Sequence, residues 1–138
     1  MANPSNHMFR LEILTPDKIA FSGEVSYVRA PGAEGYFGVL ANHAPLLAAL
    51  RIGELIIDTP GGRRYFAVSG GFLEVLKNHV RVLVETAEES SEIDVERAKQ
   101  ALLRAKNRLA THSPDIDVDR ARSSMYRALN RLKVATQK

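Results

Sequence analysis

The feature that most constrains this chain is a repeat near its C-terminal end. Residues 93–109 are IDVERAKQALLRAKNRL and residues 116–132 are IDVDRARSSMYRALNRL, so ten of the seventeen aligned positions are identical. In both copies apolar or small residues recur at i, i+3, i+7, i+10 and i+14, which predicts one apolar seam along each of two helices. The seam residues are Val95, Ala98, Leu102, Ala105 and Leu109 in the first copy, and Val118, Ala121, Met125, Ala128 and Leu132 in the second.

Each copy also begins as a helix should. Ile93 and Ile116 are each followed by an aspartate, Asp94 or Asp117, whose carboxylate can accept hydrogen bonds from the free backbone N–H groups of a first helical turn. The connection, residues 111–115, is short and polar and contains a proline. We therefore expect an antiparallel helical hairpin whose alanines bring the two helices close together.

A stripe of arginines runs beside each seam, because residues 7 and 11 positions apart fall on nearly the same side of a helix at about 100° per residue. One interpretation is an exposed basic surface, partly neutralised by acids such as Glu96 and Asp119. The other is a polyanion site, since guanidinium groups bind phosphate oxygens well. The spacing alone is compatible with both. The arginines are Arg97, Arg104 and Arg108, then Arg120, Arg127 and Arg131.

The charge of the chain favours the same region for an anionic partner. Residues 89–138 contain eleven Lys and Arg against seven Asp and Glu, which leaves +4. Residues 1–88 contain eight against nine, which leaves −1. The positive balance therefore belongs to the hairpin.

Before the hairpin, from Phe9 to about Glu88, the pattern changes to a two-residue alternation broken by Gly and Pro turns. At least eight short strands are expected, and they favour a mainly β, antiparallel sandwich or flattened barrel. We also expect Gly70 and Gly71 to form a tight hairpin turn with positive φ. The expected strands are residues 9–13, 25–30, 35–40, 46–52, 54–59, 64–69, 72–76 and 80–86. The expected core is Leu11, Ile13, Val25, Val28, Val39, Leu46, Leu50, Ile56, Phe66, Val68, Phe72, Val75, Val82 and Val84.

These patterns divide the chain into two domains. Residues 1–88 form the β-sandwich domain, in which 1–7 are expected to be a disordered leader, and residues 89–138 form the hairpin domain. The acidic, serine-containing segment 88–92 has the composition of a hinge that would let the hairpin change position. An ordinary linker explains the same composition equally well.

Several kinds of chemistry are excluded or disfavoured. The chain has no cysteine, and its four histidines have no metal-ligand spacing, so no metal site is expected. No phosphate-binding loop, dinucleotide motif or nucleophile motif occurs, which favours a binding or mechanical protein over an enzyme. The longest apolar run, residues 44–50, is too short to span a bilayer, and the N-terminus lacks a secretory pattern, so a cytoplasmic protein is expected.

One loop in the sheet half carries an isolated histidine and a proline between two apolar strands. It contains His43, Ala44 and Pro45. Such a loop can be a docking edge, although a turn histidine that bonds only within its own loop is the simpler interpretation.

Four motifs, taken in order, resemble the epsilon subunit of the F-type rotary ATP synthase. They are Gly38-Val39-Leu40 with His43-Ala44-Pro45-Leu46; Ser69-Gly70-Gly71-Phe72-Leu73-Glu74-Val75; Ile93-Asp94-Val95-Glu96-Arg97-Ala98; and Arg127-Ala128-Leu129-Asn130-Arg131-Leu132. The resemblance covers residues 8–138. It implies a ten-stranded flattened barrel or sandwich followed by a helical hairpin, in a non-catalytic subunit of the central stalk on the cytoplasmic face of the cell membrane.

The resemblance also implies partners and an action. The partners are the gamma subunit, the membrane rotor ring of c subunits and, when the hairpin is extended, the catalytic alpha and beta subunits; neither nucleic acid nor direct membrane insertion is expected. The subunit couples proton-driven rotation to ATP synthesis, and its mobile hairpin inhibits ATP hydrolysis. No cofactor is required.

ATP is implied as a regulatory ligand that binds the folded-down hairpin in some bacterial members of this family. The positions that match that site are Glu88, Ile93, Asp94, Arg97, Ala98, Arg104, Arg127 and Arg131. Docking to the rotor ring is implied for Tyr36, His43, Ala44 and Pro45. This chain departs from the family in two places: Tyr36 stands where many members have an acidic residue, and Asn42 replaces the usual glycine before His43.

The alternative function is a free-standing nucleotide- or nucleic-acid-binding hairpin, suggested by the +4 charge of residues 89–138. Tyr126 is the only aromatic residue of the hairpin, and seven acids dilute its positive field, so stacking on bases and strong attraction to nucleic acid are not expected.

Overall fold

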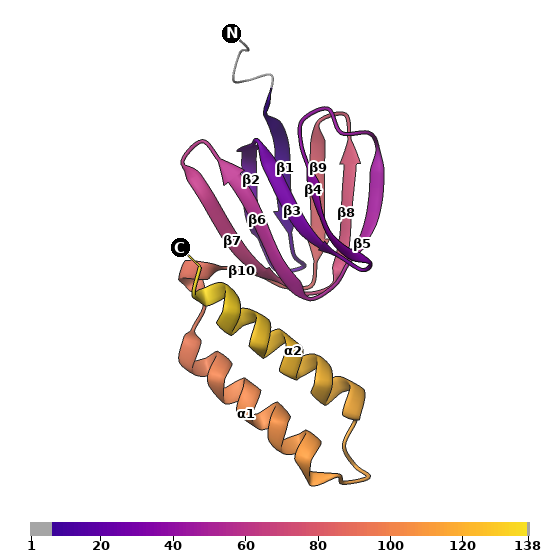
Figure 1. Cartoon of the computed structure of the whole chain (residues 1–138), viewed down its shortest axis with the longest axis vertical. Coiled ribbons are helices and arrows are strands. Elements are labelled where there is room, and N and C mark those ends of the chain that lie inside the picture. Colours follow the sequence, from indigo (N-terminus) through magenta and orange to yellow (C-terminus); the bar gives the residue numbers. More distant parts are fainter. Residues whose placement is uncertain (1–6, 138) are drawn as a thin grey trace.

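The computed structural model describes residues 7–137 and has two parts, a β-sandwich and a helical hairpin that lies against one end of it (Figure 1). The hairpin consists of α1 (Val95–Thr111) and α2 (Val118–Ala135). The predicted fold class, a mainly β N-terminal part followed by an antiparallel hairpin, is confirmed. The predicted disordered leader falls almost entirely on residues 1–6, which lie outside the described residues.

Ten strands form the sandwich, in the order β10-β7-β6-β3-β5-β8-β9-β1-β2, with β4 paired to β3. Their bounds are β1 Phe9–Leu14, β2 Ile19–Val25, β3 Tyr27–Gly32, β4 Gly35–Val39, β5 Leu46–Leu50, β6 Gly53–Thr59, β7 Gly62–Val68, β8 Gly71–Leu76, β9 His79–Val84 and β10 Ala87–Glu89. The expectation of antiparallel strands is wrong for one pair. β1 and β9 run parallel, with Leu11 opposite Val80, and this pairing joins β1 and the edge strand β2 to the rest of the sheet.

Alternation along the strands builds the core as predicted in most places. Leu11 and Ile13 on β1 are fully buried, and so is Val82 on the neighbouring β9. Phe72 was wrongly placed in the core: it is 54% exposed, because its neighbour Leu73 faces inward instead. Leu46 is only partly buried. In β8 two adjacent apolar residues fit either register of the alternation, so the sequence pattern did not decide which one points inward.

The outer face of β6 is also covered. Ile56 is buried, as predicted, but its neighbours Leu55 and Ile57 belong to the sandwich core, whereas Ile56 does not. Helix α2 contacts β6 and β7, and the first five residues of β6 are buried without interruption. A strand covered on both faces loses the alternation of buried and exposed side chains.

Two strands were missing from the sequence prediction. β2 lies at the edge of the sheet, and three of its seven residues in a row are polar or glycine, so its pattern is weak. β10 is short and acidic, and it occupies the start of the predicted hinge 88–92. Glu88 pairs with Ala67 of β7, and Ser90–Glu92 form a 3-10 turn. Part of the predicted hinge is therefore hydrogen-bonded to the sheet; its proposed bending stays a prediction.

The predicted turn at Gly70 and Gly71 is wrong. β7 and β8 are not paired, so the segment crosses between strands, and the glycines with positive φ are Gly35 and Gly62. Gly71 is required for space: a Cβ atom there would lie 1.9 Å from the carbonyl oxygen of Leu83 and 2.8 Å from the Cα of Val84.

The hairpin follows the repeat. The side chains of Asp94 and Asp117 accept hydrogen bonds from the third residue of their helices, at 3.1 Å and 3.0 Å, so both predicted N-caps are present. The alanines of the two seams are buried against each other, which confirms their predicted role. They are Ala98, Ala105, Ala121 and Ala128.

Gly71→Ala should destabilise the chain by about 3 kcal/mol, because the added methyl group meets backbone atoms of β9 that cannot move without breaking the β8–β9 pairing. Gly70→Ala is the matched control, since the nearest atom there is the Leu50 carbonyl oxygen at an ordinary 3.4 Å. Urea unfolding followed by circular dichroism measures both. Equal losses in the two variants would contradict the steric explanation.

Candidate functional site

Helix α2 docks on the sandwich through a small apolar cluster. Val134 is fully buried against Ala67 of β7 and Ile93, which precedes α1, with Tyr65 and Ala135 packed around them. The sequence analysis missed Val134 because it lies beyond the repeated segment. At about 100° per residue Val134 lies on the side of α2 away from the seam, close to the stripe of Arg127 and Arg131, so the seam periodicity gave no signal for it.

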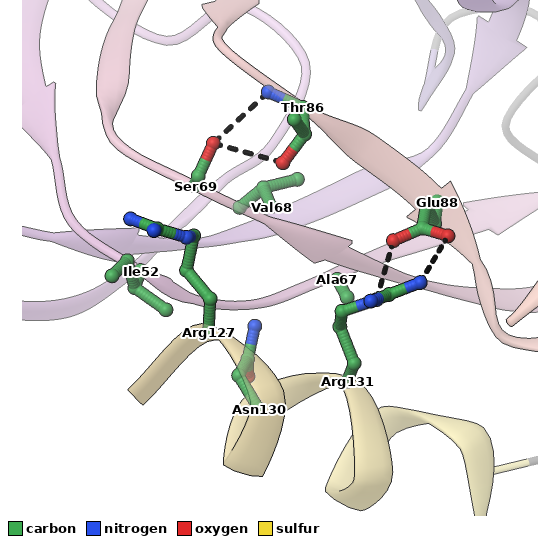
Figure 2. A pocket seen from close by; sticks show the side chains of 9 residues that line it. All are labelled: Ile52, Ala67, Val68, Ser69, Thr86, Glu88, Arg127, Asn130 and Arg131. Atoms are coloured by element: carbon green, nitrogen blue, oxygen red, sulfur yellow. Dashed lines mark hydrogen bonds and ion pairs between the residues drawn. The ribbon is translucent and has the colours of Figure 1, made fainter. Parts of the chain in front are cut away.

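Two polar contacts accompany this cluster, and Figure 2 shows one of them, the pair between Arg131 and Glu88. The Nδ2 of Asn130 donates to the carbonyl oxygen of Gly53, 2.8 Å away. Arg131 faces Glu88 of β10 with both ends of its guanidinium group: Nε lies 2.7 Å from Oε1, and Nη2 donates to Oε2 at 3.1 Å. Both side chains are about three-quarters buried, at 24% and 30% exposure, so this pair is better shielded from water than an ordinary surface pair.

The next residue of β10 forms a second pair on the other side of the strand. Nε and Nη2 of Arg64, on β7, donate to the carboxylate of Glu89 at 2.8 and 2.6 Å. The hydrogen bond to Glu89 raises the pKa of Arg64 above its usual value. β10 is therefore held to β7 by Glu89 and to α2 by Glu88.

A groove lies between α2 and the sandwich. Its inner end is a cavity of about 30 Å³ lined by Ser69, Thr86 and Arg127 among others, large enough for one or two water molecules. A wider part of about 250 Å³ continues over the hairpin, past Ala101 of α1 and Ser124 of α2. The sides of the groove are thus built from both helices and from β10.

Arg127 is the cation of this groove with the least engaged side chain. Its guanidinium group extends from α2 across the groove toward Ile52 (Figure 2). Its hydrogen-bond partner within residues 7–137 is the neutral hydroxyl of Ser124, with Nη2 donating to Oγ at 3.1 Å. A guanidinium group without a carboxylate partner is well suited to an anion.

The structure brings together three of the eight residues predicted to bind nucleotide: Glu88, Arg127 and Arg131 line the same groove. Ile93 is buried in the docking cluster, and Asp94 caps α1. Neither of these two residues lines the groove.

The other three predicted residues are all on α1. Ala98 is fully buried in the seam between the helices. Arg97 and Arg104 are exposed, and neither forms an ion pair in the described part of the chain. Their predicted contact with a nucleotide stays a prediction.

The two arginine stripes do not converge on one place, because the helices are antiparallel. Arg108 and Arg120 line a separate hollow at the tip of the hairpin, together with Asp115 and Asp117. Arg131 lies at the opposite end, near the sandwich. The stripes therefore spread along the hairpin.

The predicted ring-docking residues lie in two places. His43, Ala44 and Pro45 form the loop between β4 and β5, where the His43 Nδ1–H group donates to the carbonyl oxygen of Ala44 at 2.7 Å. Ala44 and Pro45 are exposed.

Tyr36 lies at the other end of β4, beside the turn from β3. Its hydroxyl accepts a hydrogen bond from the backbone N–H of Glu54 at 3.2 Å. The guanidinium groups of Arg29 and Arg51 lie 4.5 and 5.4 Å from the centre of its ring. Tyr36 is thus packed between two cations and does not extend the surface of the His43 loop.

No group of three or more His, Asp or Glu side chains that could hold a metal ion occurs within residues 7–137. Neither α1 nor α2 is long and apolar enough to cross a membrane.

The fold and this groove define a two-part protein, a β-sandwich that carries a docked helical hairpin, and comparison with known proteins gives its family. Residues 8–90 match the β-sandwich domain of the ATP synthase delta/epsilon chain, and residues 91–136 match the long α-helix domain of the same chain. This chain belongs to the ATP synthase delta/epsilon chain family, which confirms the resemblance found in the sequence.

Curated relatives agree with this family. The ATP synthase epsilon chain of Syntrophomonas wolfei is 53% identical over 102 residues, which cover 73% of this chain and 74% of the relative. That of Salinibacter ruber is 52% identical over 108 residues, 72% of each chain.

Solved structures agree as well. A chain in the mitochondrial ATP synthase of Euglena gracilis, solved as OSCP, F1 and c-ring, has a TM-score of 0.75 and 26% identity and covers 99% of this chain and 85% of that one. A chain from the central stalk and c-ring of the Tetrahymena thermophila enzyme has the same fold, with a TM-score of 0.65 and 17% identity over 92% of this chain and 96% of that one.

The Arg131–Glu88 pair should stabilise the docked hairpin by about 1 kcal/mol, measured as the coupling free energy between Arg131→Gln and Glu88→Gln. The distance between a label on α2 and a label on the sandwich of the full chain measures how often the hairpin leaves the sandwich. The control pair is Arg122 and Asp119, which lie 4.0 Å apart and are largely exposed, and its coupling should be close to zero. Equal coupling in both pairs would show that Arg131 and Glu88 do not hold the helix.

Proposed function

We propose that the chain is the epsilon subunit in the central stalk of an F-type rotary ATP synthase. The observation that carries this proposal is the match of both family domains, in order, over residues 8–136. In this role the subunit catalyses no reaction itself. It transmits rotation between the membrane part and the catalytic part, and it lies in the stalk at the cytoplasmic face of the cell membrane.

The partners follow from that position. The sandwich binds the gamma subunit and the rotor ring of c subunits, and the hairpin reaches the alpha and beta subunits when it is extended. The related Euglena chain comes from a structure that contains F1 and the c-ring, which supports these contacts. His43, Ala44 and Pro45 provide an exposed loop for the ring.

The full chain should form a one-to-one complex with the gamma subunit of the same synthase, detected by size-exclusion chromatography with light scattering. Steep, salt-dependent retention on duplex DNA without any association with gamma would instead favour a free-standing nucleic-acid-binding protein. Nucleotide binding without association with gamma would favour a free-standing sensor.

The hairpin is proposed to be a mobile arm that inhibits ATP hydrolysis when it extends. Its seam is made by the two helices themselves and does not require the sandwich. Its contact with the sandwich, within the described residues, is smaller: α2 packs on β6 and β7 with the Val134 cluster, one amide bond and the Arg131–Glu88 pair. The hairpin can therefore leave the sandwich without losing the interactions between its own helices.

ATP is proposed as a regulatory ligand of the docked arm. The groove that contains Arg127 and Arg131 has sides from α1, α2 and β10, so it exists only while the hairpin is docked. A ligand that binds one conformation alone shifts the equilibrium toward it by its differential affinity. Phosphate oxygens would bind Arg127 and compete with Glu88 for Arg131.

Arg127→Ala should weaken ATP binding at least tenfold, because a lost charge-assisted hydrogen bond costs about 1.5–3 kcal/mol. Isothermal titration of the full chain, with and without Mg²⁺, measures this affinity. Arg122→Ala is the control, since Arg122 is an exposed arginine of the same helix that does not line the groove. Equal affinities of the Arg127 variant and the parent would place any nucleotide elsewhere.

A further inference from the structure

Two loops of the sandwich are joined by their asparagine side chains. The backbone N–H of Asn42, in the loop between β4 and β5, donates to Oδ1 of Asn78, 2.5 Å away. Nδ2 of Asn78, in the turn between β8 and β9, donates to Oδ1 of Asn42 at 2.9 Å. We call this reciprocal pair of hydrogen bonds the Asn42–Asn78 clip.

The backbone of both loops is held in an uncommon conformation. Asn42 has φ 64° and Asn78 has φ 59°, both in the left-handed region that most residues with a side chain avoid. Asparagine tolerates this region because its short side chain can bond to nearby polar groups. The carbonyl oxygen of Asn78 also accepts from the backbone N–H of Arg10 at 3.0 Å, so the clip connects the loop after β4 to the start of β1.

The clip joins the β4–β5 loop to the β8–β9 turn, and both lie at the end of the sandwich away from the hairpin (Figure 1). Leu40, two residues before Asn42, is 62% exposed, and Leu76, two residues before Asn78, is 51% exposed. Pro45 is exposed as well. Helix α2 contacts the opposite end, at Gly53, so the docked hairpin leaves this surface open.

We propose that the Asn42–Asn78 clip is a positioning device that holds the His43–Pro45 loop in the shape that binds the rotor ring before the ring arrives. The inference rests on the proposed function, in which this loop docks on the ring. The ring is the expected occupant because the exposed leucines are continuous with that loop and because the related Euglena chain comes from a structure containing the c-ring.

The physical reason is the entropy of the loop. A loop ordered only on binding loses backbone freedom at that moment, and this loss weakens the complex. The two bonds are exposed and join neutral groups, so they add little to global stability. Their effect should therefore appear in the order of the loop and in ring affinity, and much less in the melting temperature.

Glycine variants test the clip without straining the backbone, since glycine adopts positive φ freely. Asn78→Gly removes both bonds. Asn42→Gly removes only the bond to its side chain and leaves its backbone N–H in place. Lys77→Gly is the matched control, because Lys77 has φ 51° in the same turn and its side chain makes no bond in the described structure.

The measurement is binding of each full-length variant, as its complex with gamma, to the detergent-solubilised rotor ring of the same synthase. Asn78→Gly should weaken ring binding about tenfold, or about 1.4 kcal/mol. Asn42→Gly should have a smaller effect, and the double variant should equal Asn78→Gly because the Asn78 side chain makes both bonds. Lys77→Gly should match the parent. Hydrogen exchange of residues 40–47 should quicken in the same order, with gamma binding unchanged.

The inference is wrong if Asn78→Gly speeds exchange in the loop but binds the ring like Lys77→Gly. A failure of the proposed docking looks different. The double variant His43→Ala, Pro45→Ala would then bind the ring as tightly as the parent. That result would show that the loop does not dock on the ring, and the inference would be wrong for the same reason. A chain that forms no complex with gamma would overturn the stalk assignment as a whole.

Discussion

The position of the hairpin depends on one small contact, the burial of Val134 of α2 against Ala67 and Ile93. Small side chains make this contact close but limited in area, and apolar stabilisation is roughly proportional to the area removed from water. Inside the hairpin, buried alanines line the seam of both helices. Since the seam joins the helices over most of their length and the docking cluster joins only one end of α2, the hairpin moves more easily as a unit than in parts.

The docking contacts are also close together in the chain. Asn130, Arg131 and Val134 lie within five residues near the end of α2, and each binds a different part of the sandwich. A small rotation of this last turn would break all of them together. β10 would remain, because Glu89 holds it to Arg64 of β7 independently of the hairpin. The sheet would thus stay intact during the proposed movement of the hairpin.

The sequence predicted those parts of the molecule that are set by local periodicity. Alternation found most of the strands and the core, and the repeat found both helices with their caps at Asp94 and Asp117. The errors occur where a distant strand decides the outcome. Position 71 has room only for glycine, because the backbone of β9 lies against it. Phe72 faces outward because the register of β8 turns its neighbour Leu73 inward. The Asn42–Asn78 clip joins residues far apart in the chain, so no local sequence pattern predicts it.

The arginine stripes show the same limit of local periodicity as a guide to the candidate site. Where each arginine lies in the folded hairpin decides the charge of the groove. Periodicity places three arginines on one side of each helix, but the antiparallel arrangement sends Arg108 and Arg120 to the tip. In the groove, Glu88 neutralises Arg131, which leaves Arg127 as the uncompensated charge. A triphosphate is therefore bound strongly only if it displaces Glu88 from Arg131, or if the exposed Arg104 of α1 turns toward it. Because the Arg131–Glu88 pair also holds the hairpin to the sandwich, such a ligand must replace the contact it removes, so the proposed nucleotide binding would be linked to docking of the hairpin through one guanidinium group.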